Sequence, residues 1–315
     1  MLISFLLVQL APGGPAEYLI GQSGGAAVSP QYVASLRAQF GLDRPWYIQL
    51  ISYYHLALTL QFGVSFQYGV DVWTLLRAAI PNTLLLMGVS IVLSTAAAVF
   101  LGIETSRRPG SKLDKLVSVA VLSGYSMPVF WLGQLLILLF SSVLTWLPTQ
   151  GMVSVTAPES GFGHLLDIGR HLVLPAFAYG VYQLALVLRM MRAKAQDILS
   201  EDFVTTARAK GASVTRVLYH HVLPNALPPV VMVIGVNFGF LLAGSVLTET
   251  VFGWPGMGRL LYQAIIARDF PVIQAVFVLV GVSVIIANLA ADVVVALLDP
   301  RVLATSTERP SGGAG

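Results

Sequence analysis

The 315-residue chain has no cysteine, and only 10% of its residues are charged. Without cysteine there can be no disulfide, thiolate metal ligand or cysteine nucleophile. A soluble domain carries about 25% charged residues, so the 15 acidic and 18 basic residues here are too few to cover a globule of this length. Since 56% of the residues are hydrophobic, the composition predicts an all-α protein that crosses a membrane several times. The net charge of +3 is too small to indicate nucleic acid.

Five stretches are long and apolar enough to cross a bilayer as helices. A spanning helix needs about 20 mostly apolar residues, because each residue rises about 1.5 Å through about 30 Å of hydrocarbon. The predicted spans are residues 82–103, 116–147, 172–188, 222–248 and 270–291. Pro224, Pro228 and Pro229 predict that the fourth span begins near Pro229. Residues 1–11 are apolar but short, and we interpret them as the outer half of an incomplete first helix, which brings the expected number of spanning helices to six. A short interfacial anchor is the alternative.

Basic residues are gathered in two of the connections and in the tail. The loop after span 82–103 (SRRPGSKLDK) holds four, the loop after span 172–188 holds six, and two more follow the last span. Short cytoplasmic loops of membrane proteins are enriched in Lys and Arg. These twelve of the 18 basic residues therefore predict that both loops and both chain ends are cytoplasmic. The outer segments are then residues 12–81, 148–171 and 249–269, within one transmembrane domain over residues 1–315.

The first outer segment, residues 12–81, is predicted to hold two short helices. Residues 29–40 have an amphipathic pattern between Ser29 and Gly41. Residues 46–60 are rich in Tyr, Trp and Leu without charge, as is typical of a helix at the membrane interface. The two helices would form either an outer cap over the bundle or a docking surface for an external partner.

The loop over residues 189–226 is long for a connection and has a helical pattern of its own. A first helix is expected from Ser200-Glu201-Asp202 to Gly211, and a second from Ser213 to Leu223-Pro224. Small side chains at the bend would allow another protein's backbone to approach closely. A solvated helical hairpin with a structural glycine is the alternative.

This loop resembles the EAA loop of the permease subunits of ATP-binding-cassette (ABC) importers. Gly211 and Leu223-Pro224 stand at the family spacing, and Ala207 matches the second alanine of the motif. Thr205 stands in place of the glutamate, Thr206 in place of the first alanine and His221 in place of the isoleucine, so the family's carboxylate is absent.

Other blocks extend the resemblance from about residue 6 to residue 302. They are LAPGGPAEYL, FGLDRPWYIQL, LQFGVSF, SMPVFWLGQLLILLF, LTWLPTQGM, ETVFGWPGMGRLL and LLDPRV, in the family's order. Together they are most similar to the B-type permease of bacterial dipeptide/oligopeptide importers, in the peptide/nickel family.

The resemblance implies the type I ABC importer fold in a bacterial inner membrane. The implied partners are a homologous second permease, cytoplasmic ATP-binding subunits, an extracytoplasmic substrate-binding protein that delivers short peptides, and membrane lipid. It also implies that ATP and Mg²⁺ are used by the ATPase subunits, so that this chain is no enzyme and binds no cofactor directly. The residues implied to couple to the ATPase are Thr205, Thr206, Ala207, Arg208, Ala209, Lys210, Gly211, Leu223 and Pro224. Because relatives of this branch look alike, nickel, glutathione or an oligosaccharide are alternative solutes.

The residues themselves favour a subunit that neither hydrolyses ATP nor couples transport to protons or sodium. None of the four lysines follows a glycine, so the chain lacks the Gly-Lys pair of a phosphate-binding loop. No metal-ligand spacing is present either. No acidic or basic residue lies within a predicted span, which argues against a secondary transporter or channel driven by protons or sodium.

Polar residues on apolar helices are candidates for a substrate path, because they are costly in lipid and tend to face a cavity or a neighbour. The candidates are Gln134, Gln183, Asn237, Glu249 and Asn288. Each could instead form an interhelical hydrogen bond. Glu249 could also pair with Arg259 outside the membrane.

Overall fold

The computed structural model describes residues 43–158, 160–239 and 246–298, together with the single positions 31, 34 and 38. The predicted span at residues 1–11 and most of the predicted helix at 29–40 lie outside these residues; positions 31, 34 and 38 are helical. The regular elements are the helices α4 (Trp46–Thr59), α5 (Val72–Ser106), α6 (Lys112–Ser126), α7 (Val129–Leu136), α8 (Phe162–Leu199), α9 (Asp202–Ala209), α10 (Val214–Arg216), α11 (Leu223–Gly239), α12 (Val246–Val251), α13 (Met257–Ile266) and α14 (Phe270–Leu298), with the π-helical segments η1 (Ile137–Val143) and η2 (Val217–Val222).

The described chain is built from helices that can span a membrane, which confirms the predicted all-α class. Four segments are long and apolar enough to cross: Val72–Ser106, Phe162–Leu199, Val214–Gly235 and Phe270–Val294. A fifth is added if the bent pair Lys112–Ser126 and Val129–Val143 counts as one crossing. These five segments overlap the five complete spans predicted from the sequence. Helix α4 falls where the interfacial helix at residues 46–60 was predicted.

The span predicted at residues 116–147 is not one continuous helix, because it breaks near its middle. Its two halves meet at an angle of 105°. Met127 has an extended backbone, with φ −87° and ψ 134°, and is followed by Pro128. A residue before proline is driven out of the helical region by the proline Cδ, which explains the break at this position.

The other prolines do not set helix ends, contrary to the prediction that the fourth span begins near Pro229. Helix α11 begins at Leu223 and contains Pro228 and Pro229. Helix α5 likewise begins ahead of residue 82 and contains Pro81, and α8 contains Pro175. The expected helix end at Leu223-Pro224 is also wrong, since α10, η2 and α11 follow one another without a break. In hydrocarbon an unbonded backbone group costs so much that helices persist through proline, with local π-helical adjustment.

The described residues fall into two compact units, each with its own core. The first takes the described residues up to Leu85, Gln150–Met152 and those of Leu242–Val282. Its core joins the start of α5, α13 and the start of α14, around Leu76, Met257 and Val276. The buried carboxylate of Asp269 accepts hydrogen bonds from the Ser65 hydroxyl and from the backbone N–H of Phe66 (3.1 Å), which ties the turn before α5 to the start of α14.

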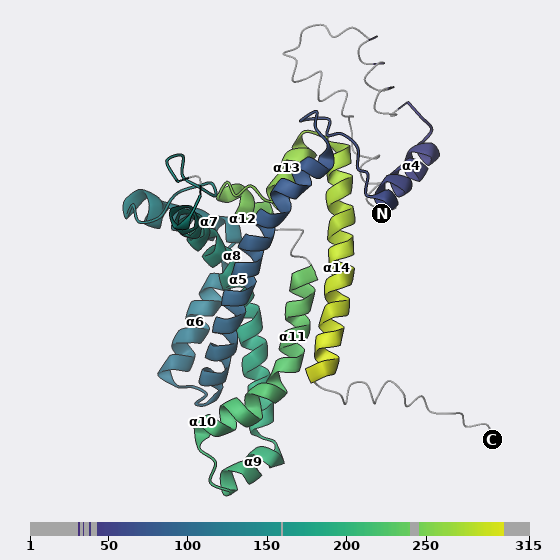
Figure 1. The fold of residues 1–315 in the computed structure, drawn as a ribbon. Helices are drawn as coiled ribbons and strands as arrows, with labels where there is room; N and C mark the ends of the chain where they lie inside the picture. The colour runs from purple at the N-terminus through teal and green to yellow at the C-terminus, as the bar shows by residue number, and fades with distance from the viewer. Residues whose placement is uncertain are drawn as a thin grey trace, which may run out of the picture. The chain divides into compact units, whose positions relative to one another are not determined.

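The second unit holds Leu86–Thr149, the described part of Val153–Leu241, and α14 from Ser283. In this unit α6, α8 and α11 run along one another with the second half of α5, and α9 and α10 lie at one end of them (Figure 1). Its core includes Ile103 of α5, Met191 of α8, Val204 of α9, Leu218 of η2 and Val230 of α11, all of them buried. The short helix α9 is therefore packed into the same core as the long helices.

Helix α11 lies close to α14 at Gly235, where a Cβ would overlap the Cβ of Ala291. We expect Gly235→Ala to destabilise the protein by about 1–3 kcal/mol, because neither rigid helix backbone can yield to the added methyl group. The double substitution Gly235→Ala with Ala291→Gly should restore most of the loss. Thermal unfolding in detergent measures both.

The matched control is Gly88→Ala in α5, where nothing lies within 4 Å of an added Cβ. This change should leave the midpoint of unfolding unchanged or raise it slightly, since alanine favours helix over glycine. Equal effects of the two single substitutions would contradict the close helix contact.

Candidate functional site

The elbow comprising α9, Gly211 and α10 has the helix, glycine, helix order that the sequence predicted. Helix α9 carries Asp202 in its first turn and ends where Gly211 takes the left-handed conformation, with φ +82°. The backbone N–H of Gly211 donates to the carbonyl of Arg208 (2.9 Å), and that of Ala212 donates to Ala207 (3.1 Å). Ser213 then caps α10 by accepting from the backbone N–H of Arg216 (3.3 Å). The direction of the chain is thus reversed by a glycine that other residues could replace only with strain.

One side of the elbow is anchored and the other is open. Val204 is fully buried in the core of the second unit, and Ala207 is half-buried. The exposed predicted residues are Thr205, Thr206, Arg208, Ala209, Lys210 and Gly211. At the start of α11, Leu223 is half-buried and Pro224 is exposed. The small exposed side chains leave the backbone of α9 accessible to another protein.

Two large apolar side chains on the elbow were missed by sequence analysis. Phe203 is 45% exposed and Val214 is 51% exposed. Their positions next to the buried Val204 and the capping Ser213 could have indicated outward faces, because neighbouring residues of a helix point about 100° apart. Exposed apolar groups of this kind beside small residues are typical of protein contact surfaces.

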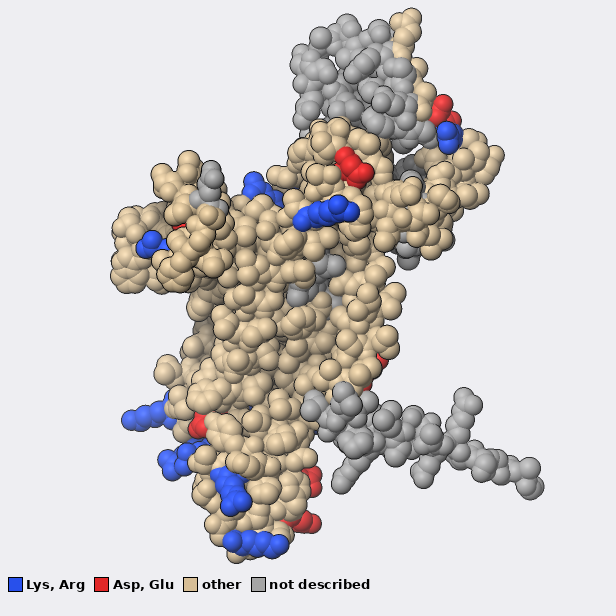
Figure 2. Space-filling model, viewed as in Figure 1, with Lys and Arg blue, Asp and Glu red and all other residues tan. Residues whose placement is uncertain are grey.

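Basic side chains surround this end of the second unit. Figure 2 shows Lys and Arg gathered over the end that carries α9 and α10, with few elsewhere along its helices. In the same unit the Arg192 guanidinium pairs with the buried Asp114 (2.8 Å) at the start of α6. The two basic loops identified in the sequence therefore belong to one end of the unit.

Four of the five polar candidates for a substrate path lie in the second unit, each on a different helix, and Glu249 lies in the first unit. Gln134 on α7 is exposed, and Asn288 on α14 is half-buried. Gln183 on α8 is 2% exposed, and its Nε2 has no hydrogen-bond partner in the described part of the chain; the same is true of Nδ2 of the half-buried Asn237 on α11. Between described residues, no hydrogen bond joins any two of the five candidates.

Glu249 on α12 is fully buried in the first unit. Its Oε1 accepts a hydrogen bond from the hydroxyl of Thr83 (2.9 Å), and its Oε2 accepts from the backbone N–H of Arg259 (2.9 Å). The alternative of a pair with the Arg259 side chain is not formed, because that guanidinium donates to the carbonyl of Gly253. Burial raises the pKa of Glu249 to about 7. Thr83 was not singled out in the sequence, since a threonine on an apolar span carries no distinctive signal.

The turn over residues 253–258 closes against this carboxylate. A Cβ on Gly256 would lie 2.5 Å from the Glu249 carboxyl group and from the Thr83 hydroxyl, so only glycine fits there. Trp254, itself buried, donates from its indole N–H to the carbonyl of Asn82 (2.8 Å). The glycine and tryptophan of the GWPGMG sequence thus seat the turn on α5, within one unit.

The raised pKa of Glu249 predicts a pH-dependent stability. A carboxyl group whose pKa rises from 4.5 to about 7 on folding stabilises the protein fully below pH 4.5 and loses this contribution as the pH rises through about 7. The protein should therefore unfold at a lower temperature at pH 8 than at pH 6. Glu249→Gln, which stays neutral, should flatten the dependence, whereas Glu201→Gln at an exposed position should leave it unchanged. Identical pH profiles for the wild type and Glu249→Gln would contradict the assignment.

Comparisons with known proteins agree with this arrangement. Residues 94–304 match the family described as "Binding-protein-dependent transport system inner membrane component". The chain is 39% identical to a di/tripeptide transport system permease of Pseudomonas aeruginosa and 36% identical to a dipeptide transport system permease of Escherichia coli, in both cases over 96% of this chain and 93% of the relative. It is also 35% identical to an oligopeptide transport system permease of Bacillus subtilis, with the same coverage.

Among solved structures, the fold is similar to a chain of the inward-facing MetNI methionine ABC transporter. The TM-score is 0.58 at 22% identity, over 72% of this chain and 97% of that chain. The chain therefore belongs to the family of inner-membrane components of binding-protein-dependent transport systems, and it is a multi-pass permease subunit of an ABC importer.

Proposed function

We propose that this permease forms, with a homologous second permease, the path by which short peptides cross the inner membrane. The relatives named for di/tripeptides, dipeptides and oligopeptides match nearly the whole chain, at 35–39% identity. An external binding protein would deliver the peptide, and cytoplasmic subunits would hydrolyse ATP with Mg²⁺. The observation that carries the proposal is the exposed elbow rooted in the core of the second unit.

The elbow is suited to transmit force from an ATPase to the spanning helices. On its outer side Thr205, Thr206 and Ala209 offer a surface of small side chains, with Phe203 beside them as an apolar anchor. On its inner side Val204 packs in one core with α8 and η2. Because η2 continues directly into α11, a displacement of α9 would move α8 and α11 as packed bodies.

The substrate path itself is proposed to use unpaired polar groups. The Nε2 of Gln183 and the Nδ2 of Asn237 are buried without partners among the described residues, so a second permease or a peptide could supply acceptors. Gln134 and Asn288 would contribute from α7 and α14. Glu249 is enclosed behind Gly256, so it would meet a peptide amino group only if the turn over 253–258 moved away.

Two other functions are separated by experiment. The same permease role for nickel, glutathione or an oligosaccharide would follow if those solutes, and not peptides, stimulated ATP hydrolysis. A secondary transporter or channel would move solute without the ATPase subunits. Proteoliposomes that contain both permeases and the ATPase subunits, assayed with loaded binding protein and each solute, distinguish all three.

The proposed orientation places the elbow and both chain ends in the cytoplasm. Because the chain has no cysteine, single cysteines can be introduced without background. A membrane-impermeant maleimide should label Val155→Cys, at a fully exposed position before α8, from outside the cell, and Thr205→Cys only in inside-out vesicles. Thr205→Cys should also cross-link to an ATPase subunit. Labelling of both cysteines from the same side would contradict the proposal.

Substitution of the elbow glycine tests its role in coupling. Proline fixes φ near −65° and lacks the N–H that Gly211 donates to Arg208, so Gly211→Pro should distort the elbow. We expect peptide-stimulated ATP hydrolysis and peptide uptake to fall to the level measured without binding protein, at normal abundance in the membrane. A bulky residue at Ala207 should do the same.

The matched control is Gly69→Pro in the first unit. Gly69 also has a positive φ (+66°), donates its N–H to a carbonyl, that of Ser65, and has nothing within 4 Å of an added Cβ. This variant should retain coupled transport. Transport that survives Gly211→Pro would overturn the assignment of the elbow as the coupling element.

A further inference from the structure

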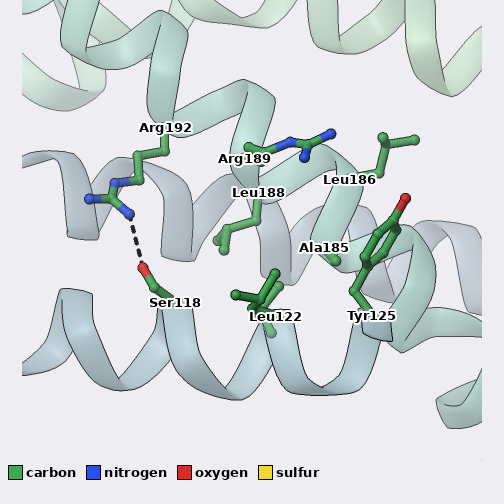
Figure 3. Close-up of a pocket in the computed structure, with 9 residues that line it drawn as sticks. Ser118, Leu122, Tyr125, Ala185, Leu186, Leu188, Arg189 and Arg192 are labelled. Carbon is green, nitrogen blue, oxygen red and sulfur yellow. Dashed lines mark hydrogen bonds between the residues drawn. The ribbon is translucent and has the colours of Figure 1, made fainter. Parts of the chain in front are cut away.

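A cavity of about 220 Å³ lies between α6 and α8 in the second unit. Most of its lining is apolar and includes Leu122, Ala185 and Leu186 (Figure 3). Its polar side chains are Ser118, Tyr125, Arg189 and Arg192. The cavity therefore combines a hydrocarbon-like wall with a cationic rim.

The two arginines at the rim differ in their partners. Arg192 is neutralised, because its Nη2 lies 2.8 Å from the Oδ2 of Asp114 and its Nη1 donates to the hydroxyl of Ser118 (2.9 Å). Arg189 is exposed and makes no ion pair or hydrogen bond with any described residue. Figure 3 shows its guanidinium beside the cavity without a bond to the residues drawn. One positive charge at the rim is thus uncompensated.

The rim lies at the level where the apolar part of α8 ends. Residues 172–188 contain no acidic or basic side chain, and Arg189 is the first charged residue after them. The cavity lining on α8 before Arg189 is Ala185, Leu186 and Leu188, which belong to the apolar stretch that hydrocarbon would surround. An empty apolar cavity would forfeit the dispersion contacts that an acyl chain supplies, whereas a free phosphate ion would gain nothing from such a lining.

We propose that this cavity binds one anionic phospholipid of the cytoplasmic leaflet. The lipid phosphate pairs with Arg189, and one acyl chain lies along Leu122, Ala185 and Leu186. Asp114 balances the charge of Arg192, so Arg189 contributes one net positive charge at the rim. A headgroup with a net negative charge is therefore favoured over a zwitterionic one. The choice of leaflet rests on the proposed orientation of the permease, but binding of the lipid does not depend on it.

Native mass spectrometry of the full chain in detergent tests the site. The chain is titrated with phosphatidylglycerol, with phosphatidylcholine of the same acyl chains, and with glycerol 3-phosphate as a soluble phosphate. One phosphatidylglycerol should bind in preference to phosphatidylcholine, and glycerol 3-phosphate should not displace it. Arg189→Gln should weaken phosphatidylglycerol binding roughly fivefold, since one basic residue near an anionic headgroup contributes about that factor.

Two further variants test the acyl-chain contact and the effect of removing a positive charge elsewhere on the same helix. Leu122 lines the cavity but is largely exposed, so Leu122→Trp can fill the space without disturbing the core, and it should weaken both lipids. Arg170→Gln removes an exposed arginine from the same helix away from the cavity, and it should change neither. Equal binding of the two lipids, an equal loss in Arg170→Gln and Arg189→Gln, an unaffected Leu122→Trp, or displacement by glycerol 3-phosphate would each overturn the proposal.

Discussion

The structure depends on one constraint, which is that backbone N–H and C=O groups in hydrocarbon must bond within the chain. This requirement keeps α5, α8 and α11 helical through Pro81, Pro175, Pro228 and Pro229. In water such prolines would end or kink a helix at a cost of about 3 kcal/mol or more each. At Met127-Pro128 the backbone becomes extended, and the helices on either side meet at an angle of 105°. The result is a set of long continuous helices.

Buried carboxylates serve as anchors for loops in the first unit. Asp269 and Glu249 are both fully buried, and each accepts hydrogen bonds from a hydroxyl and from backbone N–H groups and not from a basic side chain. An unpaired buried carboxylate would be very unfavourable, so the turns that supply these donors are held in place. The glycine at position 256 is required by the same packing, because a side chain there would collide with Glu249.

The second unit has a packed hydrophobic core and, at one end, a helical elbow with exposed apolar side chains. Val204 joins α9 to the same core as α8 and η2, whereas Phe203, Thr205 and Val214 remain exposed. A solvated hairpin without a partner would not need large apolar side chains on its outer face. The family membership of the chain and this pattern of exposure therefore support the same role for the elbow, although the glutamate of the family motif is replaced by Thr205.

The sequence by itself determined the membrane class, the five complete spans, the helix, glycine, helix order around Gly211 and the family, because these depend on local composition, spacing and capping. It did not determine where helices begin or break, since the effect of a proline depends on whether its surroundings can supply another partner. Nor did it reveal that Glu249 bonds to Thr83 and to the backbone of Arg259, or that Arg192 binds Asp114 while Arg189 has no ion pair with the residues that the structure describes. These contacts join residues far apart in the chain, so only the packing of helices against one another decides them.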